Sequence, residues 1–238
     1  MKLAFLHGTA KHIALSTACA LVALLPPTTA AQVAPSAQEV SNYKGLHAAA
    51  HRGDTAQIEQ GVRAKADLNA LDRNGRTPLH VATFAKQPEA IRLLAKAGAN
   101  LNALDSDRYD AVTIASVADD ENTLKLLLQL GASARQVTSR YDGSALIAAA
   151  HLGHDGVVRQ LIAAGAPLNL VNNLNWTAVI ESIVLGNGGA RHQATLQALI
   201  SAGASLTLTD RQGNTPLQLA KSRGYGEMVK MLEAAGAK

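Results

Sequence analysis

Two small markers recur along this chain of 238 residues with one common spacing. An aliphatic residue ahead of an alanine-rich stretch returns at intervals of 33, 33, 34, 33 and 38 residues, at Leu46, Leu79, Val112, Leu146, Val179 and Leu217. A Gly-Ala pair returns at intervals of 33, 34, 38 and 33 residues, at Gly98, Gly131, Gly165, Gly203 and Gly236. Because both markers keep one register, including the single 38-residue interval, the sequence predicts a stack of repeated units.

The clearest unit lies between Gly75 and Asn102. Thr77 stands where a hydroxyl can cap a helix, and Pro78 stands at the first helical position, where its missing N–H costs nothing. Apolar residues at helical spacing follow in two short segments, and Gly98 supplies the left-handed residue that ends the second. One such helix pair cannot bury its own apolar face, so it must pack against similar pairs.

The segment Gly75-Arg76-Thr77-Pro78-Leu79-His80 resembles the start of an ankyrin repeat, and weaker copies of it extend over residues 43–238. The resemblance implies an all-α ankyrin-repeat solenoid of about six helix-turn-helix repeats with short β-turn fingers. It also implies a protein-binding function without catalysis. In the third repeat Asp110 replaces the capping threonine, and it can still accept backbone N–H groups. The last repeat is polar outside, as a terminal repeat must be.

Two segments depart from the regular unit. The fifth repeat has five extra residues, and they fall around residues 187–191, so we expect a longer loop between its two helices. Residues 32–42 are rich in Ala, Ser and Gln, and we expect a loose lead-in segment there.

The first 31 residues have the pattern of a secretory signal peptide. Lys2 and Lys11 supply positive charge, residues 13–25 are apolar, and small residues follow up to Ala31. The apolar run is too short for a comfortable membrane span. We therefore expect a periplasmic or secreted protein that is not attached to a membrane after cleavage. The single cysteine, Cys19, lies in this segment.

The charge balance gives no sign of a nucleic-acid partner. The precursor carries a net charge of +4, but residues 32–238 contain 20 Lys and Arg against 18 Asp and Glu. No run of basic residues is longer than two, so we expect no nucleic-acid surface. A capped repeat array has no need to self-associate, and we expect a monomer.

Catalytic, cofactor and metal sites find little support in the sequence. His47 and His51 are four residues apart and could share a zinc ion, but no third ligand accompanies them. In ankyrin repeats, the histidine equivalent to His47 forms a hydrogen bond between repeats. The glycine-rich loop at Gly188 lacks the Lys-Ser/Thr pair of a phosphate-binding loop. We therefore predict a non-enzymatic protein with no cofactor, no metal and no catalytic residue.

The candidate binding surface follows from the family's geometry. The residue two positions before the helix-start proline faces the concave side in ankyrin arrays, and here it is often aromatic or basic. The last residues of the first helices continue this surface, and several of them are apolar. The predicted partner-binding residues are Tyr43, Arg76, Phe84, Tyr109, Val117, Leu152, Trp176 and Val184.

The predicted function is therefore an exported interaction protein that binds one folded protein. Similar exported bacterial ankyrin proteins imply a role in stress protection or toxin neutralisation. Two alternatives stay open from the sequence: a secreted effector that binds host proteins, and a protein that binds a metal or a small ligand.

Overall fold

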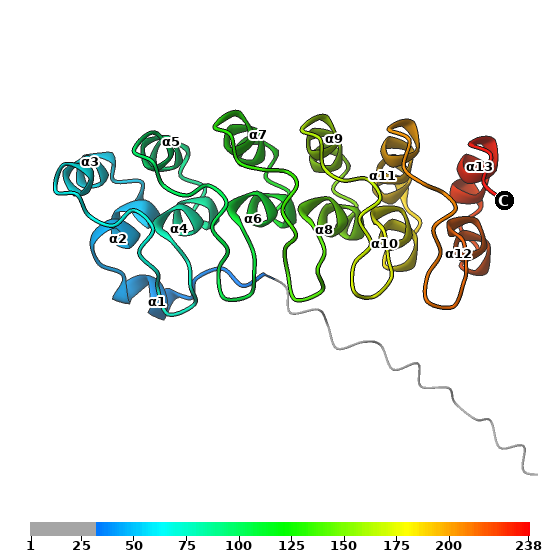
Figure 1. Cartoon of the computed structure of the whole chain (residues 1–238), viewed down its shortest axis with the longest axis horizontal. Helices are drawn as coiled ribbons and strands as arrows, with labels where there is room; N and C mark the ends of the chain where they lie inside the picture. Colours follow the sequence, from blue (N-terminus) through cyan, green and yellow to red (C-terminus); the bar gives the residue numbers. More distant parts are fainter. Residues whose placement is uncertain (1–31) are drawn as a thin grey trace, which may run out of the picture. The chain divides into compact units, whose positions relative to one another are not determined.

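The computed structural model describes residues 32–238, which form one lead-in helix followed by six stacked helix pairs (Figure 1). The lead-in helix is α1 (Ala37–Asn42). The first helices of the pairs, here called inner helices, are α2 (Gly45–Arg52), α4 (Pro78–Phe84), α6 (Ala111–Val117), α8 (Ala145–Leu152), α10 (Ala178–Val184) and α12 (Pro216–Ser222). The second, outer helices are α3 (Thr55–Arg63), α5 (Pro88–Lys96), α7 (Glu121–Gln129), α9 (Asp155–Ala163), α11 (Ala190–Ser201) and α13 (Gly226–Ala234).

The loops that join each outer helix to the next inner helix project to one side as a row of fingers (Figure 1). Within residues 32–238 there is no β-strand, and one isolated bridge joins Thr138 to Gly143 in a finger. The all-helical solenoid of about six repeats that the ankyrin resemblance implied is therefore confirmed.

The helix starts follow the capping chemistry expected from the sequence. The Thr77 hydroxyl accepts the His80 N–H, while His80 Nδ1 accepts the Thr77 N–H at 3.0 Å, so the two residues cap each other. In the third repeat Asp110 replaces the threonine, and its carboxylate accepts the Thr113 N–H at 2.7 Å. The predicted cap at Asp110 is confirmed.

The core is a continuous layer between the inner and outer helices. Inner helices contribute small residues such as Ala82, and outer helices contribute larger ones such as Ile91 and Leu94, all fully buried. Small residues on one side allow neighbouring helices to approach closely, so the layer packs with few aromatic rings. The first outer helix, α3, buries only Ile58, consistent with a terminal repeat that has one neighbour.

The five-residue insertion lengthens the loop between the two helices, as expected, but the loop takes up only part of it. The inner and outer helices of the second repeat are joined by residues 85–87, whereas residues 185–189 join those of the fifth. Helix α11 spans 12 residues, against 9 for α9. Part of the insertion therefore extends the helix. The extension brings Arg191 within 2.8 Å of Asp119 in the third repeat and 3.6 Å of Asp155 in the fourth.

The lead-in segment also differs from the expected loose coil. Ser36 caps α1 through a capping box with Glu39, and this Ser-x-x-Glu pattern is a helix-start signal in the sequence. The segment is therefore partly helical.

The predicted signal peptide, residues 1–31, lies outside the described residues. Among the helices of residues 32–238, none combines the length and the hydrophobicity needed to cross a membrane.

Candidate interaction surface

Four of the five fingers are organised by the side chain at their start. The carboxylate of Asp72 accepts the backbone N–H groups two and four residues later, at 2.8 Å each. Asp105, Asn172 and Asp210 make the same pair of bonds in their fingers. These bonds close the loop on itself, so each of these four fingers has a defined shape without a regular strand.

Neighbouring fingers are linked into a row. Backbone hydrogen bonds run from Ser106 N–H to the Asn74 carbonyl at 2.9 Å and from Asn173 N–H to the Tyr141 carbonyl at 2.8 Å. Two ion pairs between the second and third fingers add to these links, Arg108 with Asp142 at 2.7 Å and Arg140 with Asp107 at 3.3 Å. The fingers therefore present one connected surface.

Two of the predicted aromatic residues, Tyr109 and Trp176, lie at the base of the fingers. The Tyr109 carbonyl accepts the Asp105 N–H, and the Trp176 carbonyl accepts the Asn172 N–H, so both residues close the loop just before an inner helix. Their side chains are half-buried. Part of each side chain is therefore covered by the protein itself, and the rest is open to a partner.

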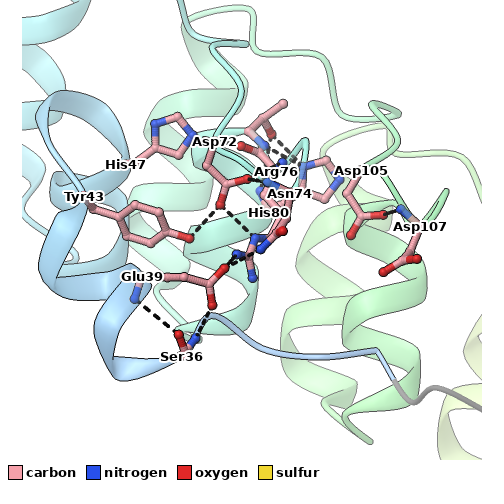
Figure 2. A network of polar contacts seen from close by, with 11 residues as sticks. Ser36, Glu39, Tyr43, His47, Asp72, Asn74, Arg76, His80, Asp105 and Asp107 are labelled. Atoms are coloured by element: carbon pink, nitrogen blue, oxygen red, sulfur yellow. Dashed lines mark hydrogen bonds and ion pairs between the residues drawn. The ribbon is translucent and has the colours of Figure 1, made fainter.

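Arg76 is buried and internally paired, which corrects its prediction as an exposed binding residue (Figure 2). Its side chain is 3% exposed and forms ion pairs with Asp72, at 2.8 Å, and with Glu39 of α1. The Tyr43 hydroxyl donates to the same Asp72 carboxylate at 2.8 Å. Arg76 and Tyr43 therefore fasten the lead-in helix to the first finger.

The charges in this network are mutually stabilised. Hydrogen bonds from Ser36 to the Glu39 carboxylate, together with Arg76, hold the pKa of Glu39 below its usual value. Burial alone would raise the pKa of Asp72, but hydrogen bonds from the Arg76 N–H and the Tyr43 hydroxyl outweigh it and lower that pKa. Burial raises the pKa of Tyr43, and its bond to Asp72 adds to this effect.

The predicted apolar positions on the inner helices lie in one row. Phe84, Val117 and Val184 end α4, α6 and α10, and each is half-buried. Leu152 ends α8 and is exposed. The structure thus places these four residues at equivalent points of successive repeats, where their side chains reach the surface.

A second apolar row was missed by the sequence reasoning. Immediately before four of the five finger-start residues stands an exposed aliphatic side chain, 38–65% exposed: Leu71, Leu104, Val137 and Val171. We call this set the finger row. The signal was present in the sequence, because the four residues are separated by 33, 33 and 34 positions. Repeated exposed aliphatic residues on neighbouring fingers form a surface suited to protein contact.

A buried polar cluster lies between the fourth and fifth repeats, and it was also missed. Glu181 on α10 is 5% exposed, and its Oε1 accepts a hydrogen bond from Asn172 Nδ2 at 2.9 Å. The Nδ1 atom of His151 on α8 lies 3.4 Å from Glu181 Oε2. Burial raises the pKa of Glu181 to about 7, against the lowering effect of the Asn172 bond.

His47, one of the two histidines considered as metal ligands, contacts a backbone oxygen, and so does His154. His47 Nε2 lies 2.8 Å from the Arg76 carbonyl, and His154 Nδ1 lies 2.9 Å from the Ser116 carbonyl. Both contacts join one repeat to a neighbour. Over residues 32–238, no group of three or more His, Cys, Asp and Glu side chains is arranged to hold a metal ion.

Comparisons with known proteins agree with this architecture. The family model for ankyrin repeats matches residues 46–138, 111–210 and 145–238. The chain is 36% identical over 190 residues to the ankyrin repeat protein YahD from Escherichia coli, covering 79% of this chain and 94% of that protein. It is also similar, at 44% identity and a TM-score of 0.76, to an ankyrin repeat domain from Acinetobacter baumannii, over 81% of this chain and 98% of that one.

A further structural relative comes from a complex of known composition. The chain is 26% identical, with a TM-score of 0.67, to a chain from the complex of a predatory endopeptidase of Bdellovibrio bacteriovorus with an immunity protein. The match covers 81% of this chain and 98% of that chain.

Proposed function

The chain belongs to the ankyrin-repeat family, and from this we propose that it is an exported, non-catalytic module that binds a folded protein in the periplasm. Ankyrin repeats generally serve as protein-binding scaffolds. The partner binds across the fingers and the ends of the inner helices, and binding neutralises the partner or protects the cell from stress.

One observation carries the proposed binding surface: the finger row. Leu71, Leu104, Val137 and Val171 recur at one position of four linked fingers, and all are exposed. Aliphatic side chains gain about 25 cal/mol for each Å² that a partner removes from water. The half-buried rings of Tyr109 and Trp176 stand at the bases of the same row of fingers, and Tyr and Trp often dominate binding energy at interfaces.

Export is supported by the composition of the chain. Residues 1–31 have the charged, apolar and small-residue segments of a signal peptide, and the remaining residues contain no cysteine. The neutralising role is supported by the structural relative from the endopeptidase–immunity protein complex. That relative shares the array architecture with this chain over almost its full length.

The surface is tested with a variant that changes all four aliphatic residues of the finger row to serine. Because these side chains are exposed, the variant should keep its helical circular dichroism. Immobilised protein is incubated with periplasmic extract, the captured protein is identified, and its affinity is then measured with purified components. We expect the four-serine variant to lose at least about tenfold in affinity, since hot-spot truncations cost 2 kcal/mol or more.

The matched control is Val62→Ser, which removes an exposed aliphatic side chain from the first outer helix. It should bind like the unchanged protein. Equal affinity of the four-serine variant and the unchanged protein would refute the proposed surface.

Export is tested separately by mass spectrometry of the protein from periplasmic and cytoplasmic fractions. A periplasmic form that begins at residue 31 or 32 is expected. An intact N-terminus in the cytoplasm alone would refute export.

A further inference from the structure

The fifth repeat departs from the other repeats at two positions that contact each other. Glu181 occupies an inner-helix position at which the other five repeats carry aliphatic residues: Ala48, Val81, Ile114, Ala148 and Leu219. Asn172 occupies a finger-start position that carries an acid or a threonine in the other fingers: Asp72, Asp105, Thr138 and Asp210. Since Asn172 Nδ2 donates to Glu181 Oε1, the two departures form one unit.

The chemistry of the pair explains why the amide stands at this finger. An aspartate at position 172 would place a second carboxylate against Glu181, and it would offer no donor. Asn172 supplies the donor and still organises the finger, because its Oδ1 accepts the N–H of Leu174 at 3.0 Å and of Trp176 at 2.9 Å. One side chain therefore connects the buried carboxyl group to the finger that carries Trp176.

The groups that face Glu181 provide little positive charge. His151 from α8 lies 3.4 Å away, and its backbone carbonyl is contacted at 2.9 Å by His192 Nε2 from α11. Over residues 32–238, no lysine or arginine lies within ion-pair distance of Glu181. Burial lowers the pKa of His151, and repulsion from His192 and His154 adds to this effect. A charged Glu181 would thus face an uncharged imidazole and a single amide donor.

From this cluster we propose that Glu181 is a proton-dependent positioning residue for the finger that carries Trp176. The protonated carboxyl group accepts from Asn172 and leaves its own O–H for His151. Loss of the proton leaves a buried anion whose bond to Asn172 becomes charge-assisted and stronger. Asn172 then transmits the change to the backbone of Trp176, at the edge of the proposed binding surface.

The biological use of this coupling as regulation rests on the proposed function, because only a partner-binding surface has an affinity to regulate. The coupling itself exists without a partner. It is therefore measured on the isolated protein, and its failure would leave the test of the finger row unaffected.

Trp176 is the only tryptophan in the chain, so its fluorescence reports on this finger. The emission spectrum is recorded from pH 5 to pH 9 for the purified protein and for Glu181→Gln, His151→Gln and His192→Gln. The matched control is Glu227→Gln, which neutralises an exposed glutamate of α13. Circular dichroism confirms that each variant keeps its helices.

We expect an emission change with a midpoint near pH 7 in the unchanged protein, in the control and in both histidine variants. We expect the change to be absent in Glu181→Gln. A change that persists in Glu181→Gln, or one that disappears in either histidine variant, would overturn the proposal.

A second measurement separates a real movement from simple quenching of fluorescence. The side-chain carboxyl carbon of Glu181 and the two N–H groups of Trp176 are followed by NMR in one titration. All three signals should move with a shared midpoint near pH 7. A carboxyl signal that titrates while both Trp176 N–H signals stay still would show that Glu181 does not position the finger.

Discussion

The buried carboxyl group of Glu181 makes a testable contribution to the pH dependence of stability. Burial raises its pKa from 4.5 to about 7 in the folded protein. Between these two values the folded state binds more protons than the unfolded state, so stability falls as pH rises. The contribution is fully present below about pH 4.5 and is lost as the pH passes through about 7.

The size of the effect follows from the two pKa values. The rise from 4.5 to about 7 corresponds to about 3 kcal/mol of folding free energy, because one pKa unit is worth 1.36 kcal/mol. Glu181→Gln mimics the protonated carboxyl group at every pH. We therefore expect the variant to match the unchanged protein near pH 4 and to be more stable by about 3 kcal/mol near pH 8.

The assay is urea denaturation followed by far-UV circular dichroism at pH 4, 5, 6, 7 and 8. The quantity to plot is the difference in unfolding free energy between Glu181→Gln and the unchanged protein, because other titrating groups cancel in it. His80 is one such group, since burial lowers its pKa and its contribution has the opposite sign. Glu227→Gln serves as control and should give a flat difference. A flat difference for Glu181→Gln as well would refute the argument that burial governs this carboxyl group.

Two further substitutions test other parts of the structure by the same urea assay. Arg76→Met leaves the buried Asp72 carboxylate without its charged partner and should lower the free energy of unfolding by about 3 kcal/mol. The control Arg92→Met breaks an exposed pair with Glu89 and should lower it by less than about 1 kcal/mol. Similar losses from both substitutions would contradict the buried network. Gly188→Ala places a Cβ atom 2.6 Å from the Tyr225 ring at a φ of +68°, so it should destabilise by about 2 kcal/mol more than Gly213→Ala, where φ is +80° and the added Cβ meets open space. Equal effects at the two glycines would show that the Tyr225 contact does not restrict the insertion loop.

The fold was predictable because its signals are local and repeated. A cap at Thr77, a proline after it and a glycine at the end of the second helix recur in register, and repetition makes weak local signals reliable. The substitution of Asp110 for threonine was readable for the same reason, since both side chains can accept the same N–H group.

The candidate site was less predictable because burial depends on distant partners. Arg76 looked like an exposed hot-spot residue, but its partners Asp72 and Glu39 enclose it, and Glu39 lies in a segment predicted to be loose. The capping pattern Ser36-x-x-Glu39 could have revealed the helix that carries this partner.

Glu181 and the finger row were missed for a different reason. Both lie outside the helix starts and the Gly-Ala helix ends, where the repeat pattern is strongest. Among the six repeats, Glu181 is the one acid at a position that is otherwise aliphatic, and an aliphatic residue precedes four of the five fingers. The unusual residue types at Glu181 and in the finger row are visible in the sequence. Their exposure and their contacts are visible only in the structure.

The polar network that joins α1 to the first finger gives the two ends of the array different resistance to local unfolding. In a linear stack the terminal repeats have one neighbour and open first. Here Glu39 pairs with Arg76, and the Tyr43 hydroxyl donates to Asp72. The first repeat therefore cannot unfold locally without separating buried charges. In the last repeat the ion pair between Lys221 and Glu233 is exposed, so separating it costs far less than separating the buried pair of Arg76 and Asp72. We therefore expect local unfolding to begin in the last repeat and to reach the first repeat, which the lead-in helix covers, at the end.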